Sequence, residues 1–398
     1  MSKSESLRQR VRLRAVQGTA VGTVAAAVVE QLESRRLLCT LGQDEPAVVP
    51  GAEPVHVYDA FGEHLNLNIP DAGEIDIAPA APARAASPAP MLAAAAVSAP
   101  VGGLSGKIAY MNAGHGWTYN GASWATQRPE YQELVEDFQT QDQITYYAQY
   151  LLNAGATVVP TRPLGHQLSE VIVDNNDAGF STPMGSWSTN TASSTYWSNV
   201  NGTDTANRYR FASAGASETH VARFTPTIPT TGFYPVYTWV NNGSNRIIDQ
   251  TYRINSAGGS QEVKVNHKYT GKGWIYLGNF YFEAGTGGTV EISNQSGNSG
   301  SVIADAIRFG NGMGTWEGDG TGPLSGKPKE EELSLYWLYE SRGWTASGTR
   351  VAQSIVDNGT ASDNSAGIAA PPHWIAYMND GGQGTDVERL HLSVHSNG

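Results

Sequence analysis

The sequence is poor in cysteine, in charged residues and in long apolar runs. Its 398 residues include one cysteine, so no disulfide can form within the chain, and core burial or bound metal must stabilise it if it is exported. Only 16% of the residues are charged, and the formal net charge is -12. This acidic balance excludes a broad phosphate-binding surface, so we expect no nucleic-acid partner. No 18 consecutive residues are apolar, so we expect no membrane-spanning helix.

The first forty residues form a compositional block of their own. A basic start precedes a small apolar run from Ala15 to Val29, which is the charge order of an export signal, although glycines interrupt the run and no cleavage site follows. The string Glu33-Ser-Arg-Arg-Leu-Leu38 then resembles the LEPR-XLL motif of large surface or exported proteins of planctomycete-type bacteria, with serine in place of proline. This resemblance implies an extracellular, cell-surface or periplasmic location. The alternative is an amphipathic helix end with no sorting role.

Residues 41–104 lose hydrophobic periodicity and include an Ala/Pro tract from Ala78 to Pro100. Such a tract has too few large apolar groups to offset the loss of chain entropy on folding. We therefore expect a disordered amino-terminal region, with residues 1–40 as the export segment and 41–104 as a mobile linker.

From Lys107 the pattern becomes that of an α/β domain, which we expect over residues 105–170 and again over 311–398. Residues 107–112 and 156–160 predict buried strands with a helix over 129–154 between them, which implies parallel strands and a right-handed crossover. A second helix is predicted over 329–342 and a last strand over 390–395. The residues expected on the apolar face of the first helix are Leu134, Val135, Phe138, Tyr147, Ala148, Leu151 and Leu152.

Residues 171–310 have a different texture, rich in Gly, Asn, Ser and Thr. Short alternating runs separated by turn residues predict a β-sandwich inserted into the α/β domain. The fold class expected is therefore a multidomain chain with an α/β part and an all-β part. The predicted strands are 208–211, 220–224, 234–240, 262–265, 288–293 and 302–309.

Two histidines follow predicted strands of the α/β part. His115 comes after the strand that ends at Asn112, and His395 ends the last strand. In an open α/β sheet, ligand sites form beyond the carboxyl ends of the strands, so both imidazoles are expected at one edge. Glu136, near the start of the intervening helix, adds a carboxylate.

These residues resemble the zinc-dependent N-acetylmuramoyl-L-alanine amidases. The resemblance lies in Gly114-His-Gly116, in a glutamate nineteen residues before Gly155, in a strand closing in Thr161-Arg162, and in Ser393-Val-His-Ser-Asn397. It implies that His115, Glu136 and His395 bind one zinc ion, with a fourth position for water. Glu133 is the nearest competitor for the carboxylate position, and Asp137 is a possible partner behind the ligands. In that family the general base follows the second histidine, so we expect it beyond Gly398, in a complete form of a truncated chain.

Residues 171–310 resemble the golvesin or xanthan-lyase carbohydrate-binding-like domain, which implies a jelly-roll-type sandwich. The resemblance is carried by strings such as Gly185-Ser-Trp187, Phe233-Tyr-Pro-Val-Tyr-Thr-Trp239 and Val302-Ile-Ala-Asp-Ala-Ile-Arg-Phe309. Sugar rings stack on exposed indoles, but packing in the core is the favoured role for each tryptophan of the segment. The tryptophans considered for sugar contact are Trp187, Trp197, Trp239 and Trp274. Asp174, Asn175 and Asp177 either hold a structural calcium ion or, as we favour, open the first strand with an Asx-turn.

Two hypotheses follow from this organisation. The first is a secreted zinc hydrolase of the amidase type, directed at peptidoglycan or an extracellular polysaccharide, whose inserted sandwich places it on glycan. The second is a noncatalytic surface protein in which the sandwich binds carbohydrate or mediates adhesion. Zinc binding that depends on His115 and His395 distinguishes the first from the second.

Overall fold

The computed structural model describes residues 98–130, 135–192, 194–360, 362–379 and 388–395. The predictions made for residues 1–40 and for most of the linker 41–104 lie outside this part of the chain, as does Glu133. Within the described residues, no helix has the length and hydrophobicity needed to cross a membrane.

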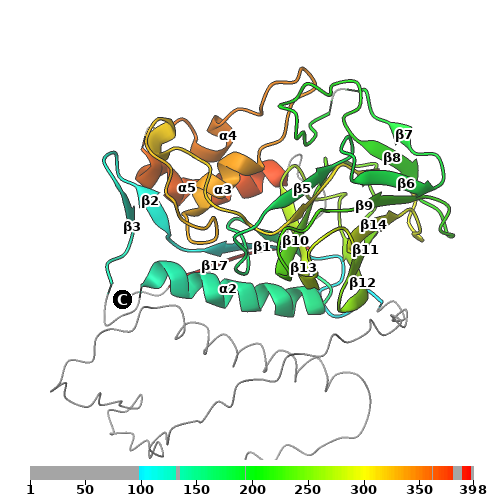
Figure 1. Ribbon diagram of the computed structural model, residues 1–398, viewed down its shortest axis with the longest axis horizontal. Helices are drawn as coiled ribbons and strands as arrows, with labels where there is room; N and C mark the ends of the chain where they lie inside the picture. Colours follow the sequence, from blue (N-terminus) through cyan, green and yellow to red (C-terminus); the bar gives the residue numbers. More distant parts are fainter. Residues whose placement is uncertain (1–97, 131–134, 193, 361, 380–387, 396–398) are drawn as a thin grey trace, which may run out of the picture. The chain divides into compact units, whose positions relative to one another are not determined.

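The largest sheet of the described residues, here called the central sheet, is mixed and has seven strands (Figure 1). In spatial order its strands are β17 (Arg389–Val394), β1 (Ile108–Ala113), β4 (Thr157–Pro160), β13 (Trp274–Phe282), β10 (Gly232–Trp239), β16 (Ala306–Phe309) and β5 (Val171–Asp174). Strand β1 pairs in parallel with β17 and with β4, as predicted. Strand β4 then pairs antiparallel with β13, where Val158 faces Tyr276. Strands of the α/β part and of the predicted sandwich therefore share one sheet.

Helix α2 (Glu136–Asn153) connects β1 to β4 and packs beneath the sheet. It begins seven residues later than predicted because Val135 has an extended backbone, with φ of −116° and ψ of 118°. Its apolar face also differs from the prediction, since Tyr147 is 44% exposed. The side chains it buries are Asp137, Thr140, Gln141, Ile144, Ala148 and Leu152.

The other helices lie on the opposite side of β1 from α2 (Figure 1). Helix α3 (Ser334–Ser341) lies within the predicted range 329–342 and is shorter than predicted. Helix α5 (Asp363–Met378) was not predicted, because its Pro371-Pro372 pair is a signal against helix. Two short elements complete this group, namely η1 (Gly318–Gly320) and α4 (Ser354–Asp357).

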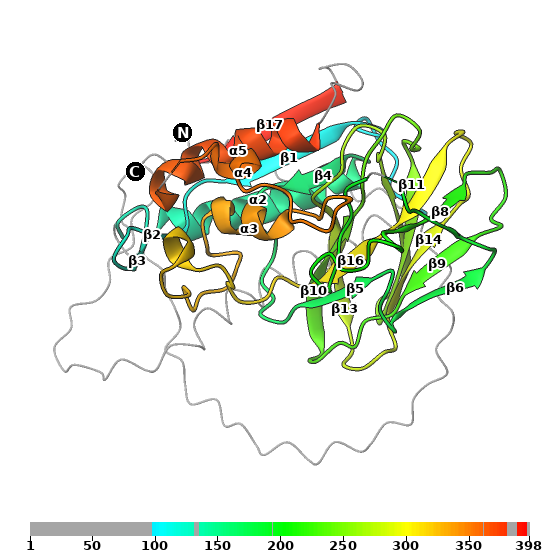
Figure 2. The same cartoon turned by 90° about the horizontal axis from the view of Figure 1, so that it is seen from above.

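The remaining strands of the predicted sandwich form two further antiparallel sheets, which lie beyond β10 and β13 (Figure 2). One has the order β12 (Gly259–Val265), β11 (Gln250–Ser256), β14 (Thr289–Ser293), β9 (Val221–Phe224) and β6 (Phe180–Met184); the other has the order β15 (Ser301–Ala304), β8 (Arg210–Ser213) and β7 (Ser188–Thr189). The run predicted as one strand over 302–309 divides at Asp305 into β15 and β16, which belong to different sheets. Strands β2 (Trp117–Tyr119) and β3 (Trp124–Thr126) form a small hairpin that is a separate two-stranded sheet.

Most buried apolar side chains of both parts belong to one cluster. It joins Ile108 of β1 and Val158 of β4 to Trp239 of β10, Trp274 of β13 and Trp337 of α3. The fold is therefore mixed α/β with several sheets. The domain boundaries at 171 and 310 stay a prediction, while the central sheet and the core continue across both of them.

Candidate metal centre

His115 lies in a tight loop directly after β1. The loop requires unusual backbone angles, since His115 has a φ of 63° and Gly116 a φ of 144°. A non-glycine residue in the left-handed region stores strain, and such residues cluster at functional sites. Gly114 is needed for a different reason, because a Cβ atom there would lie 2.3 Å from Nδ1 of His395.

His395 follows β17, whose register with β1 brings the two strand ends together. Ala113 is paired with Val394, and the amide of Gly114 donates to the carbonyl of Val394 at 2.9 Å. Residues that follow these two positions must leave the sheet at the same edge. The parallel pairing predicted from the sequence thus places both imidazoles side by side.

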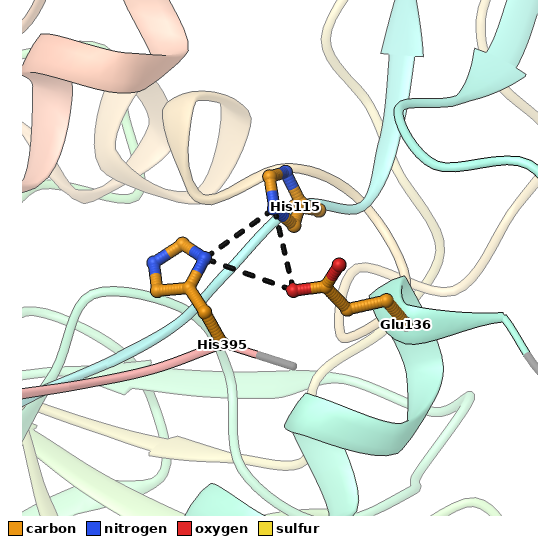
Figure 3. A group of neighbouring side chains, drawn as sticks. All are labelled: His115, Glu136 and His395. Carbon is orange, nitrogen blue, oxygen red and sulfur yellow. Dashed lines mark hydrogen bonds and ion pairs between the residues drawn. The ribbon is translucent and has the colours of Figure 1, made fainter. Parts of the chain in front are cut away.

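Glu136 is the first residue of α2, so its side chain extends from the helix start toward the His115 loop (Figure 3). The next residue, Asp137, is fully buried and accepts backbone N–H groups from that loop. Its Oδ1 accepts from Gly116 at 2.7 Å and from Gln127 at 3.0 Å, and its Oδ2 accepts from Arg128 at 3.2 Å. Asp137 therefore fixes the loop that carries His115.

Three ligand atoms converge between these elements (Figure 3). Nε2 of His115 lies 3.3 Å from Nδ1 of His395 and 3.5 Å from Oε1 of Glu136, and the latter two atoms are 3.8 Å apart. Tetrahedral zinc with bonds of about 2.0–2.2 Å places its ligand atoms roughly 3.3–3.6 Å apart. The structure brings together all three residues that the sequence proposed as ligands, with separations that suit such an ion.

Neighbouring side chains select the tautomer of His115. Gln127 donates through Nε2 to Oδ1 of Asn364 at 2.9 Å, which turns its Oε1 toward Nδ1 of His115 at 3.3 Å. The proton of the imidazole therefore belongs on Nδ1, and the lone pair of Nε2 faces the other two ligand atoms. A hydrogen bond to the ring nitrogen that does not face the metal orients a metal-binding histidine.

His395 has a matching partner on its own strand. Its Nε2 lies 3.0 Å from Oγ of Ser393, which also accepts from Nδ2 of Asn112 at 3.1 Å. Asn112 is fixed in turn by the hydroxyl of Thr161 at 2.7 Å. In the tautomer in which Ser393 accepts the proton of Nε2, His395 directs the lone pair of Nδ1 at His115 and Glu136. The Arg128 guanidinium donates to Nε2 of His115 at 3.2 Å and lies 3.4 Å from Oε2 of Glu136, so a positive group already borders these acceptors. Two imidazole nitrogens and a carboxylate oxygen that face one another are also a donor set that fits a metal ion.

Electrostatics at the site favour the neutral imidazole that a metal requires. Burial lowers the pKa of His115, and this effect exceeds the opposing effect of the Glu136 carboxylate. The guanidinium of Arg128 lies at the edge of the site, with Nε 3.2 Å from Nε2 of His115 and 3.4 Å from Oε2 of Glu136. Its side chain is 51% exposed, so it remains accessible from solvent. A cavity of about 650 Å³ opens here, lined by both histidines, Arg128 and His391.

Arg162 is a supporting residue whose role sequence reasoning missed. It is 1% exposed and donates to the carbonyls of His115 at 2.7 Å, Asp137 at 2.9 Å and Glu330 at 2.8 Å. Burial lowers its pKa to about 10, so it stays charged at neutral pH. One cation thus ties the His115 loop to the start of α2. The Thr161-Arg162 string was the signal, but it revealed none of these partners.

The four tryptophans considered for sugar contact are buried, which corrects that assignment in favour of packing. Trp239 and Trp274 are 0% and 1% exposed, and the indole of Trp239 donates to the carbonyl of Ser341 at 3.0 Å. Trp187 and Trp197 are 9% and 6% exposed. An indole face covered by protein atoms cannot stack on a pyranose ring. Trp197 nevertheless lines a second cavity, of about 740 Å³.

Comparisons with known proteins concern mainly the segment between the two halves of the α/β part. Residues 171–311 match the Golvesin C-terminal domain. A xanthan lyase of Bacillus sp. (strain GL1) is 33% identical over 153 residues, which cover 38% of this chain and 16% of that enzyme. The golvesin and xanthan-lyase resemblance is therefore confirmed, and the segment is related to part of a carbohydrate-active enzyme.

Two solved structures show weaker similarity. A Paenibacillus xanthan lyase is 29% identical with a TM-score of 0.30, and the match covers 35% of this chain and 13% of the lyase chain. A Paenibacillus sp. cycloisomaltooligosaccharide glucanotransferase is 17% identical with a TM-score of 0.27, and the match covers 44% of this chain and 23% of the glucanotransferase chain. The chain thus spans a small part of the relatives that it matches.

Proposed function

We propose that His115, Glu136 and His395 bind one zinc ion in a secreted or cell-surface hydrolase of the N-acetylmuramoyl-L-alanine amidase type, which acts on peptidoglycan or an extracellular polysaccharide. The observation that supports this proposal is the convergence of two imidazole nitrogens and one carboxylate oxygen within 4.8 Å of one another. Two histidines and one acid are a common ligand set of catalytic zinc sites, where a fourth position stays open.

When bound, zinc supplies a Lewis acid that polarises an amide carbonyl and lowers the pKa of a water molecule. The chain's own residues hold the ligands in place: Gln127 accepts the Nδ1 proton of His115, Ser393 is hydrogen-bonded to Nε2 of His395, and Asp137 and Arg162 fix the loop. Arg128 stands at the cavity with an exposed guanidinium, where it binds a carbonyl or carboxylate of the substrate. Asp137 does not serve as the base, because both of its oxygens accept backbone N–H groups.

The test is zinc content by mass spectrometry and titration calorimetry on the full chain. We expect about one zinc ion in the wild type and loss of binding in His115→Ala, Glu136→Gln and His395→Ala. His391→Ala is the matched control, since His391 lines the same cavity from the same strand but lies outside the ligand set. Absence of binding in the wild type, or equal loss in the control, would overturn the zinc proposal.

Hydrolysis is tested separately on the zinc-loaded protein. No described residue is assigned as the general base, so we expect purified peptidoglycan to release free amino groups of L-alanine only slowly, about 10²–10⁴-fold below a complete amidase. We expect Arg128→Gln to reduce this release further, with zinc content unchanged. Zinc binding without release would retain the metal site and reject the amidase activity. The zinc measurement and the hydrolysis measurement can therefore reject the metal site and the amidase activity separately.

A second candidate function, binding of an acidic polysaccharide without catalysis, is favoured by the cavity of about 740 Å³. Its lining includes Trp197, Trp316, Arg342 and Arg350. The two carboxylates of the lining are neutralised, since Glu170 pairs with Arg308 at 2.6 Å and Glu340 with Lys329 at 2.7 Å. No ion pair joins Arg342 or Arg350 to a carboxylate in the described part of the chain, so the cavity keeps positive charge.

Isothermal titration with xanthan fragments and with a neutral glucan tests this alternative. We expect the acidic fragments to bind and the neutral glucan to bind weakly, and Arg350→Gln to reduce the affinity for the acidic ones. Lys264→Gln is the control, because Lys264 lies on β12 and outside this cavity. Equal binding of both glycans, or of neither, would count against the alternative.

A further inference from the structure

Two polar segments of the golvesin-like region meet at the end of β5. The first is the turn Asp174–Asp177, and the second is the loop 204–207 that precedes β8. The side-chain amide of Asn176 joins them, because its Nδ2 donates to Oδ2 of Asp204 at 2.7 Å and to the carbonyl of Asn207 at 2.9 Å. Asn207 returns the contact by donating to Oδ1 of Asn176.

The Asx-turn predicted at this position is present. Oδ1 of Asp174 accepts the backbone N–H of Asn176 at 2.8 Å, and Oδ2 of Asp177 accepts that of Asp174 at 2.8 Å. These bonds use one oxygen of Asp174. They leave its second carboxylate oxygen to be explained.

Four side-chain oxygens of the two segments are buried and have no hydrogen-bond partner among the described residues. They are Oδ2 of Asp174, Oδ1 of Asn175, Oδ1 of Asp204 and Oδ1 of Asn207. Asp174 is 1% exposed and Asn175 is 2% exposed, so bulk solvent does not reach these two side chains. Buried polar atoms are nearly always satisfied, and four unsatisfied acceptors in two contacting segments point to a missing positive partner.

The charges of the same region lack compensation. The carboxylates of Asp177 and Asp204 repel that of Asp174. Those of Asp174 and Asp204 also repel the buried carboxylate of Asp305. No ion pair joins any of these four carboxylates to a basic side chain within the described ranges. A bound cation would offset both the free-energy cost of burying these carboxylates and their mutual repulsion.

We propose that the Asp174–Asp177 turn and the 204–207 loop bind a calcium ion through Asp174, Asn175, Asp204 and Asn207. All four ligands are oxygens, from carboxylates and amides, which is the set that calcium prefers and zinc does not. Calcium accepts irregular coordination by six to eight oxygens, whereas magnesium requires a near-ideal octahedron and retains its waters. The ion fastens β5, the last strand of the central sheet, to the loop before β8.

Calcium binding is measured on the full chain carrying His115→Ala and His395→Ala, so that the zinc ligands cannot contribute. After dialysis against a chelator, we expect one calcium ion by calorimetry, tryptophan-sensitised terbium luminescence that calcium displaces, and a melting temperature that rises with calcium concentration. Magnesium at the same concentration should reproduce little of this shift. Absence of calcium binding at millimolar concentration would overturn the proposal.

The ligand assignment is tested with Asp174→Asn and Asp204→Asn, each expected to raise the calcium dissociation constant about tenfold or more, since affinity follows the ligand charge. Asp204 is only partly buried, so Asp204→Asn keeps the test valid even where Asp174→Asn fails to fold. Glu317→Gln, at an exposed position, is the charge-matched control. Unchanged affinity in Asp204→Asn would reject this site. In the background with both histidines intact, Asp204→Asn should retain its zinc.

Discussion

His115 combines features that only the folded chain makes visible. Its position in a Gly-His-Gly turn after a strand was predictable, but its left-handed backbone and the choice of its metal-facing nitrogen follow from contacts with distant residues. Gln127 sets the tautomer, and Gln127 is itself oriented by Asn364, more than 200 positions away in the sequence. The sequence shows that residue 115 is a histidine, but which ring nitrogen carries the proton depends on contacts made in the folded chain.

The ligand set itself was predictable because strand ends and helix starts are short-range patterns. His115, Glu136 and His395 were named from the sequence, and the structure brings them together. The residues behind them were harder to assign. Arg162 binds three carbonyls from separate segments, and no local spacing signals such a role. Tryptophans were likewise ambiguous, since indoles serve equally in cores and at sugar sites.

A buried histidine far from the metal centre makes stability depend on pH. His267 is 0% exposed, and its Nε2 lies 2.7 Å from the hydroxyl of Tyr252. That hydroxyl already accepts from Thr238 and Gln250, so it donates its own proton to His267. Burial lowers the pKa of His267 to about 3, below the ordinary value of 6.5. The neutral form is therefore favoured in the folded state.

We predict that His267 contributes to acid denaturation. Because the folded-state pKa lies below the unfolded one, its contribution to stability is complete above pH about 6.5 and decreases by about 1.4 kcal/mol per pH unit as the pH falls toward 3. Urea unfolding of wild type and His267→Gln at several pH values measures this difference. The variant should lose stability less steeply below pH 6.5. Parallel curves for the two proteins would contradict the prediction.

At the scale of elements, alternating patterns located most strands, and the failures have identifiable causes. Helix α5 contains Pro371-Pro372, a pair that predicts a break, yet both prolines lie within the helix. The run 302–309 looks continuous, but Asp305 is buried between two sheets and accepts the amide of Trp197 at 3.2 Å. Pattern shows that a segment is extended and does not show which sheet it joins.

The contact between the two strand ends yields a prediction for Gly114. A Cβ atom at this position would lie 2.3 Å from Nδ1 and 2.4 Å from Cε1 of the His395 ring. We expect Gly114→Ala to displace His395 and to weaken zinc binding by about tenfold or more, which is the size of effect seen when a residue that hydrogen-bonds a metal ligand is lost. The circular dichroism spectrum should stay unchanged. Zinc titration calorimetry measures the effect.

Gly103→Ala is the matched control for Gly114→Ala. No heavy atom lies within 4 Å of a Cβ built at Gly103, and its backbone lies outside the left-handed region. This variant should bind zinc as the wild type does. If Gly114→Ala binds zinc equally well, the close approach of the two strand ends does not position His395.

At the scale of the whole molecule, composition suggested separate parts because glycine-rich and asparagine-rich turns begin near residue 171 and end near 310. The structure joins these parts through β4 and β13, and through a core that no local pattern reveals. Such pairing brings together residues more than a hundred positions apart. Sequence periodicity reports on neighbours along the chain, so it predicted many of the strands, missed others such as β11 and β13, and did not show that both parts share one sheet.

Trp337 connects the two parts and allows the common core to be tested. It lies on α3 and is 2% exposed; its ring is 4.2 Å from Cζ of Arg308 on β16 and 5.5 Å from the ring of Tyr237 on β10. Removal of a buried indole leaves a cavity and costs about 3–5 kcal/mol. Because its neighbours belong to the golvesin-like region, we expect Trp337→Ala to destabilise that region as well as the α/β part.

Hydrogen exchange under native conditions measures the stability of each strand in this variant. Amides of β1 and of β10 should lose protection by similar amounts, and urea unfolding followed by circular dichroism and by fluorescence should give one shared transition. Ile368→Ala is the control, since Ile368 is 79% exposed on α5 and its truncation should change stability by less than about 0.5 kcal/mol. Loss of protection confined to β1 would mean that the two parts unfold independently despite their common sheet. A single transition would make the golvesin-like region part of the scaffold that holds His115 and His395, because β13 supports β4, and β4 supports β1.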